Sequence, residues 1–153
     1  MADDKTIDML NGVLADATVF YYKLHNYHWN VTGPGFYTLH DVFEDLYKEW
    51  SGILDELAER VKSLGGDPLP TLAKCVEVSG IKEETERDLD ANTMVQRTLN
   101  DIHAQRERMK AVQERAQEVN DKTTENILDD FVDASAKHVW MLSAFLGKRA
   151  DQD

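Results

Sequence analysis

The sequence predicts an all-α domain, a bundle of four long helices with one long crossover, containing a short helix, between helices two and three. Apolar residues recur at intervals of three and four along four segments, as on the buried face of an amphipathic helix. The chain breakers, only 3 Pro and 8 Gly, gather between these segments. A crossover of about twenty residues can traverse a bundle, which gives an up-down-down-up order. We expect one domain over residues 1–153, with short flexible ends at about 1–5 and 148–153.

The first two helices end at clear stop signals. The first is expected over residues 6–30, because Gly33-Pro34-Gly35 then interrupts the helical pattern. The second is expected over residues 39–64, with Thr38 as its N-cap and Gly65-Gly66 as its stop. Their inward positions are Met9, Val13, Phe20, Leu24 and Tyr27 in the first, and Val42, Phe43, Leu46, Trp50, Ile53, Leu54, Leu57 and Val61 in the second.

The crossover and the last two helices follow. We expect a short helix over about residues 72–76, a long and mostly polar helix over 92–119, and a last helix over 125–146. Asn120-Asp121-Lys122 separates the last two, and Thr123 or Thr124 can cap the final one. Four long helices joined in this order form a bundle of the ferritin type.

Composition limits the kind of protein. Hydrophobic residues make up 42% and charged residues 30%, a balance typical of a soluble globular chain. No apolar run reaches the roughly 20 residues that span a bilayer, and the first residues lack a secretory signal. Cys75, the only cysteine, cannot form an internal disulfide, so a cytoplasmic location is predicted. The net charge of −12 disfavours nucleic acid and anionic membranes as partners and favours cations.

Bundles of this type often hold two irons in their core through Glu-x-x-His pairs. None of the five histidines has an acidic residue three positions before it, so the sequence predicts no such centre within one bundle. A different set of candidate ligands lies in the first two helices: His28, His40, Glu44, Asp55 and Glu59. Imidazole and carboxylate ligands together suit iron.

The spacing of these ligands favours a site between two subunits. His40 and Glu59 lie nineteen residues apart on one helix, which is roughly 28 Å at the rise of an α-helix. Since a ligand atom lies only about 2 Å from its metal, one chain cannot close a site from both ends of this helix. Two antiparallel copies can, because the start of one helix then lies beside the end of the other. Taken singly, each residue is more often a structural or solvated residue than a ligand.

The chain resembles the Dps family, the mini-ferritins known as DNA-binding proteins from starved cells. The resemblance covers nearly the whole chain and is strongest in His28-Trp29, in His40, and in the spacing of Asp55 and Glu59-Arg60. Other similar stretches are residues 24–34, 64–66 and 137–142.

The resemblance implies a hollow shell of twelve subunits with ferroxidase centres between two-fold partners. Each centre oxidises Fe(II), with hydrogen peroxide preferred over oxygen, at two irons, and Fe(III) mineral is stored inside. On this resemblance His28, His40, Asp55 and Glu59 are the catalytic and metal-binding residues, and Glu44 stands where the family usually has Asp.

Two other regions depart from the family pattern. The basic tail with which many members bind DNA is missing, so DNA binding is predicted to be weak or absent. Around the position where the family has an acidic residue of its iron pore, this chain has Asn126. The flanking carboxylates could form a pore or could only favour the helix dipole; they are Asp121, Glu125, Asp129 and Asp130.

Two alternative functions remain at this stage. One is a DNA-condensing or interaction shell whose ferroxidase site is weak or vestigial. The other is a regulator loaded with zinc or manganese, because these ligands also accept other divalent ions.

Overall fold

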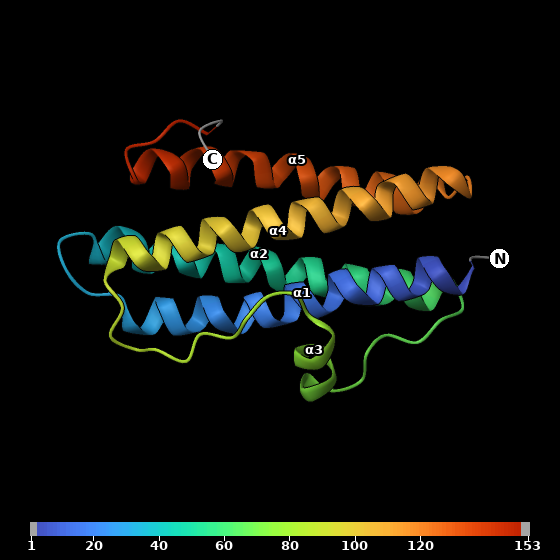
Figure 1. Ribbon diagram of the computed structural model, residues 1–153, viewed down its shortest axis with the longest axis horizontal. Helices are drawn as coiled ribbons and strands as arrows, with labels where there is room; N and C mark the ends of the chain where they lie inside the picture. Colours follow the sequence, from blue (N-terminus) through green and yellow to red (C-terminus); the bar gives the residue numbers. More distant parts are fainter. Residues whose placement is uncertain (1–2, 151–153) are drawn as a thin grey trace.

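The computed structural model describes residues 3–150 and contains four long helices and one short helix (Figure 1). All of the described secondary structure is helical, as the sequence predicts. The helices are α1 (Asp4–Asn30), α2 (Phe36–Ser63), α3 (Leu72–Val78), α4 (Ala91–Glu118) and α5 (Lys122–Phe145).

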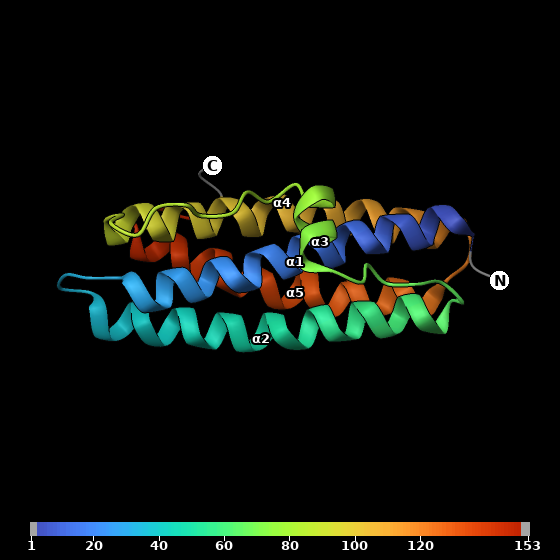
Figure 2. The same ribbon diagram turned by 90° about the horizontal axis from the view of Figure 1, so that it is seen from below.

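The up-down-down-up order of the long helices is confirmed. Helix α2 returns alongside α1, and the crossover then runs back along the bundle, so that α4 has the direction of α2 and α5 that of α1 (Figures 1 and 2). Helix α3 lies within the crossover and packs against α1 near the middle of its length. Short turns therefore join α1 to α2 and α4 to α5, and the one long connection spans the bundle.

Several helix ends differ from the prediction. Helix α1 already begins at Asp4, because the Asp3 carboxylate accepts a hydrogen bond from the Thr6 amide at 2.9 Å. The flexibility expected at about residues 1–5 and 148–153 stays a prediction; residues 1–2 and 151–153 lie outside the described part. Helix α2 begins at Phe36 after Gly35, so Thr38 is inside the helix and is not its N-cap. At its end Gly65 has φ +85°, a conformation that favours glycine, as the stop signal predicts.

The core lies along the bundle axis and is anchored by Trp50. This side chain is 2% exposed and meets the Phe20 ring edge-on, with centroids 4.9 Å apart. Its indole N–H donates to Gln105 Oε1 at 2.9 Å, so the buried polar atom has a partner. Trp29, in contrast, is 58% exposed.

Buried polar side chains of α1 fix the path of the crossover. Asn11 holds the backbone at Asp67 and Leu69, and Asp16 accepts hydrogen bonds from Ser79 and Gly80. Further along α1, hydrogen-bond donors reach the second half of the crossover: the Lys23 ammonium to the Lys82 carbonyl, Asn26 to the Glu84 and Glu86 carbonyls, and the Tyr27 hydroxyl to the Glu84 carboxylate. One face of α1 thus holds a connection that has little regular structure of its own.

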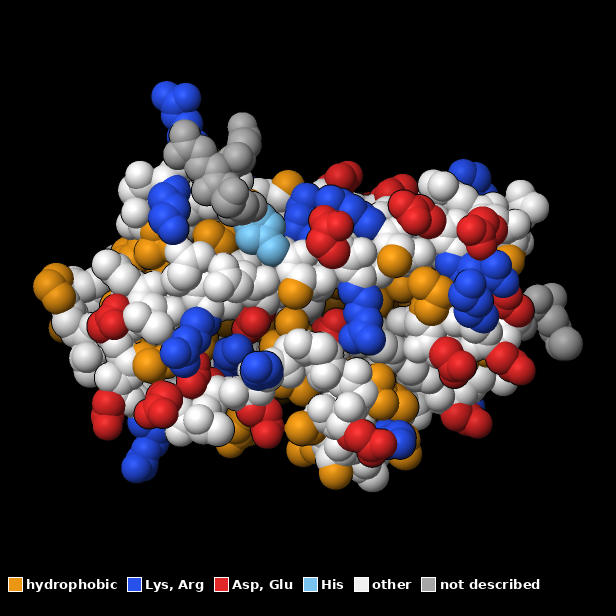
Figure 3. All heavy atoms as spheres, in the orientation of Figure 1, with side chains coloured by type: hydrophobic (Ala, Val, Ile, Leu, Met, Phe, Trp, Pro, Cys, Tyr) orange, Lys and Arg blue, Asp and Glu red, His pale blue; other side chains and the backbone are white. Residues whose placement is uncertain are grey.

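The surface carries interspersed charges and some exposed apolar groups (Figure 3). Apolar side chains gather around α3, where Leu72 is 73% exposed. None of the helices in residues 3–150 is both long and apolar enough to cross a membrane.

Candidate metal centre

Two histidines meet where α1 ends and α2 begins. The turn over residues 31–35 brings His28 against His40, and their rings stack with centroids 3.8 Å apart and planes 15° from parallel. Each ring is also held by the backbone of the other residue. His28 Nδ1 lies 2.8 Å from the His40 carbonyl oxygen, and His40 Nδ1 lies 2.8 Å from the His28 carbonyl oxygen.

These reciprocal contacts decide which ring nitrogens are free. A carbonyl oxygen can only accept a hydrogen bond, so Nδ1 of each ring must carry the hydrogen and donate it. In a neutral imidazole the other nitrogen, Nε2, then keeps its lone pair. A backbone carbonyl behind Nδ1 is the arrangement that orients metal-binding histidines in proteins. His28 and His40 are therefore both prepared to bind a metal ion through Nε2.

Glu44 lies one turn after His40 on the same helix. Its Oε2 is 3.1 Å from the ammonium of Lys48, and its Oε1 accepts a long contact of 3.5 Å from the Tyr47 hydroxyl. The hydrogen bond and the positive charge of Lys48 lower the pKa of Glu44. The carboxylate is therefore ionised at neutral pH, as a metal ligand must be.

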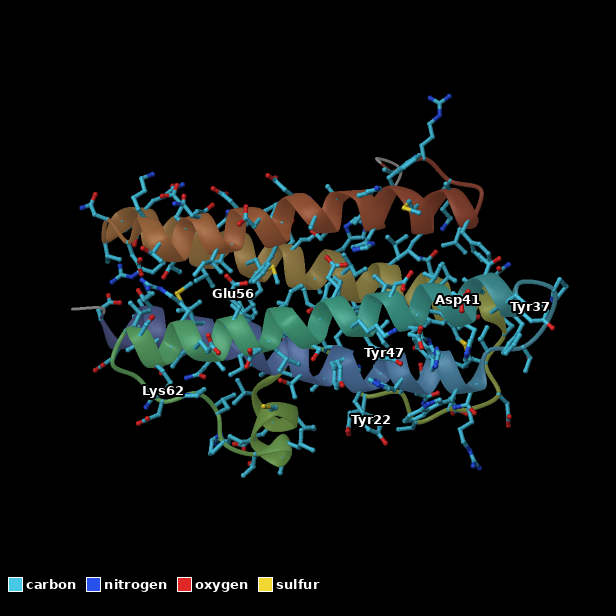
Figure 4. The ribbon with its side chains drawn as sticks, turned by 180° about the vertical axis from the view of Figure 1, so that it is seen from behind. Tyr22, Tyr37, Asp41, Tyr47, Glu56 and Lys62 are labelled. Atoms are coloured by element: carbon cyan, nitrogen blue, oxygen red, sulfur yellow. The ribbon has the colours of Figure 1, made fainter. Side chains whose placement is uncertain are left out.

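Tyr47 supports the histidine pair from the side and is a residue that the sequence analysis did not identify. Its ring lies edge-on to His28, with centroids 5.3 Å apart, and stacks on His25 at 3.8 Å. His25 in turn holds the Tyr21 carbonyl through Nδ1 at 2.9 Å. Figure 4 shows Tyr47 on α2, directed toward α1. The intervals His25 to His28 and Glu44 to Tyr47, three residues each, were the available signal in the sequence.

Asp55 and Glu59 lie on exposed positions further along α2, away from the histidines. In Figure 4 the labelled Asp41, next to His40, and Glu56, next to Asp55, are well separated along the helix. Among residues 3–150, no group of three or more His, Cys, Asp or Glu side chains is close enough to hold a metal ion. The chain thus brings His28, His40 and Glu44 to one end of α2 and presents the two other carboxylates at a distance.

Arg60 fixes the end of α2 that carries these carboxylates. Its guanidinium donates to Asp121 Oδ1 at 2.8 Å and to Thr124 Oγ1 at 2.9 Å, both at the start of α5. Side-chain exposures of 15% for Arg60 and 13% for Asp121 show that the pair is largely buried. The residue following Glu59 therefore ties α2 to α5.

Asp121, one of the four expected pore residues, has a structural role within this chain. It is the N-cap of α5 and accepts hydrogen bonds from the Thr124 amide at 3.0 Å and the Thr124 hydroxyl at 2.5 Å, so neither expected threonine is the cap. Partial burial raises the pKa of Asp121, but the hydrogen bonds from Thr124 and the charge of Arg60 outweigh it and lower the pKa overall.

The other three expected pore residues differ in their surroundings. Glu125 pairs with Lys122 at 2.7 Å and accepts from Gln117 at 2.8 Å. Asp129 accepts from Gln113, and Asp130 is exposed to solvent. Whether these carboxylates line a pore depends on neighbouring subunits and stays a prediction.

Replacing Asp121 tests its role as a cap. Asp121→Ala removes both the N-cap and the partner of a largely buried arginine, so we expect the free energy of unfolding to fall by about 2–3 kcal/mol. The matched change Asp130→Ala, at an exposed position of the same helix, should alter it by less than about 0.5 kcal/mol. Urea unfolding followed by circular dichroism measures both. Equal stability of the two variants would contradict the capping role.

Comparison with known proteins adds to this geometry. The ferritin-like domain family matches residues 7–150. A curated relative, the DNA protection during starvation protein of Brevibacillus brevis, is 47% identical over 138 residues, covering 90% of this chain and 92% of that protein. The crystal structure of a Dps protein from Bacillus brevis superimposes with a TM-score of 0.92 at 44% identity, covering 95% and 99% of the two chains. That of a Vibrio cholerae Dps, described as a member of a broad superfamily of ferritin-like diiron-carboxylate proteins, has a TM-score of 0.90 at 32% identity and covers 93% and 89%.

Proposed function

The chain belongs to the Dps family of ferritin-like proteins, and on that basis we propose that it is a ferroxidase and iron store. In this proposal two subunits form each oxidation site, Fe(II) is the substrate, and hydrogen peroxide is the preferred oxidant, with oxygen as the alternative. Twelve subunits enclose the cavity in which Fe(III) is kept. The cytoplasmic location inferred from the sequence belongs to the same proposal.

The observation that supports the proposal best is the mutual fixing of His28 and His40. A histidine with a purely structural role has no need of a free Nε2, whereas here both rings use Nδ1 for the backbone and leave Nε2 available. The carboxylate of Glu44, one turn away, adds an oxygen ligand of the kind that iron accepts together with imidazole.

The remaining ligands are assigned to a second copy of the chain. We place the first iron position between His28 and two carboxylates of the partner subunit, the partner's Asp55 and the partner's Glu59. The second position belongs to His40 and Glu44, and the partner's Asp55 bridges the two. A two-fold axis near the middle of α2 would bring these residues together and would create two identical sites.

Two iron ions at one site explain how peroxide is reduced safely. Hydrogen peroxide needs two electrons to break its O–O bond and yield two hydroxide ions. Two Fe(II) ions supply one electron each and become two Fe(III), so charge and atoms balance without release of a hydroxyl radical. The residues of the chain hold the two ions near each other, and their carboxylates offset the positive charge that increases on oxidation.

Stoichiometry tests this function. Protein loaded anaerobically with Fe(II) and then given limiting peroxide should oxidise two Fe(II) per peroxide, and a spin trap should detect little hydroxyl radical. The double variant His28→Ala/His40→Ala provides the control, because it lacks the ligands of one half of the site. One Fe(II) oxidised per peroxide, together with trapped radical, would contradict the proposal.

Direct binding to DNA is not part of the proposed function. The net charge of −12 per chain repels the phosphate backbone, and the described C-terminal residues contribute only Lys148 and Arg149 as cations. We expect no retardation of a linear duplex in a gel shift at about 150 mM salt, where a lysine-rich histone serves as the positive control. Strong retention that disappears as salt rises, in protein without ferroxidase activity, would favour the DNA-condensing shell.

A further inference from the structure

The structure pairs one proposed iron ligand with a competing cation. We propose that Lys48 holds the Glu44 carboxylate in the absence of metal and thereby raises the Fe(II) concentration at which the second iron position fills. This inference rests on the proposed function, and it adds a residue that controls the order in which the two irons bind.

The geometry places Lys48 and an iron ion in competition for the negative charge of Glu44. The Lys48 ammonium is 3.1 Å from Oε2, within the range of an ion pair between residues one helical turn apart. Oε1 has only the 3.5 Å contact from Tyr47, which is too long for a strong hydrogen bond. An iron ion that uses this carboxylate would lie close to the ammonium, and the two positive charges repel. Lys48 therefore weakens iron binding at Glu44 unless its side chain, 63% exposed, moves into solvent.

The first iron position has no such competitor in this chain. His28 is held by a backbone carbonyl and by the aromatic side of Tyr47, both uncharged. In the described part of the chain, no lysine or arginine forms an ion pair with Asp55 or Glu59. Only the second position competes with a cation for one of its ligands.

The size of the effect follows from the exposure of the pair. An exposed pair of residues four apart on a helix changes an equilibrium by about twofold. Partial covering by a second subunit would lower the local dielectric constant and strengthen the Lys48–Glu44 interaction. We therefore expect about a threefold change in the affinity of the second position for Fe(II). The first position then fills first, and the two-electron reaction starts only when Fe(II) is high enough to fill the second.

The inference is tested by an anaerobic titration of the assembled protein with Fe(II), in which isothermal calorimetry measures both binding steps. Lys48→Gln should tighten the second binding step about threefold and leave the first unchanged. The control is Lys110→Gln, which removes a similar exposed ion pair, with Glu107 at 3.2 Å on α4, and should change neither step. In a Glu44→Gln background, Lys48→Gln should have no further effect, because Lys48 acts through Glu44.

Three results would overturn the inference: no change in Lys48→Gln, an equal change in both binding steps, or the same gain in the Glu44→Gln background. Failure of the proposed function gives a different result, since Fe(II) would then produce no saturable binding in any of the proteins. The titration thus separates an error about Lys48 from an error about the site.

Discussion

Assemblies made from two variants that are each inactive will oxidise Fe(II) at about one quarter of the wild-type rate. The first variant, His28→Ala/His40→Ala, lacks the histidine half of the site. The second, Asp55→Asn/Glu59→Gln, lacks the distant carboxylates but keeps similar side-chain volumes. Rates are measured by the absorbance of Fe(III) after addition of peroxide to anaerobically loaded protein.

The expected value follows from the symmetry of a two-fold pair. A mixed pair contains two sites. One takes its histidines from the second variant and its carboxylates from the first, so it is intact. The other takes the defective half from each variant and has lost both. Random association makes half of all pairs mixed, which restores one site in four. A site contained within one chain would remain broken in every copy, and the mixture would be inactive.

A second mixture controls for nonspecific rescue. Combining the single variants His28→Ala and His40→Ala places both defects in the same half, so no pairing regenerates a complete site. Activity in this mixture equal to that of the first would contradict the assignment of halves. Native mass spectrometry of differently tagged subunits verifies that mixed pairs have formed.

The fold was largely predictable from local signals. Gly65 has the positive φ that the predicted stop signal requires, and the long crossover determined the order of the helices. The start of α2 was placed three residues too late, because Thr38 has the side chain of a cap while the chain turns earlier, at Gly35. The position of an N-cap depends on where the backbone turns into the helix, and residue type alone does not specify that point.

The sequence proposes the members of the candidate site but not their geometry. His28 and His40 are candidate ligands on the grounds of residue type, spacing and family resemblance. Their reciprocal hydrogen bonds depend on how the turn over residues 31–35 aligns two helix ends, and no sequence pattern encodes that alignment. The exposure of Trp29 was also not evident from the sequence, since its neighbour His28 is buried while Trp29 itself faces outward. The i, i+4 pair of Glu44 and Lys48, in contrast, was present in the sequence.

The interior polar residues of α1 were missed altogether, and Asp16 is the one whose loss should cost most. Its side chain is 4% exposed, and Oδ1 accepts from the Ser79 hydroxyl, the Gly80 amide and the Arg108 guanidinium at 2.8–2.9 Å. Asp16→Ala removes the shared acceptor of three donors that are themselves partly exposed and can turn to water, so we expect a loss of about 2–3 kcal/mol in the free energy of unfolding.

Two further measurements distinguish this anchoring role from a simple change of charge. Asp41→Ala removes the same charge from an exposed position of α2 and should change stability by less than about 0.5 kcal/mol. Hydrogen exchange should show that Asp16→Ala loosens the crossover near Gly80 before the helices open, because the lost contacts join that segment to α1. Uniform loosening of all helices, or a stability equal to that of Asp41→Ala, would show that Asp16 does not anchor the crossover. Since α1 also carries His28, a crossover released in this way should leave the reciprocal hydrogen bonds of the histidine pair in place, because none of them involves the crossover.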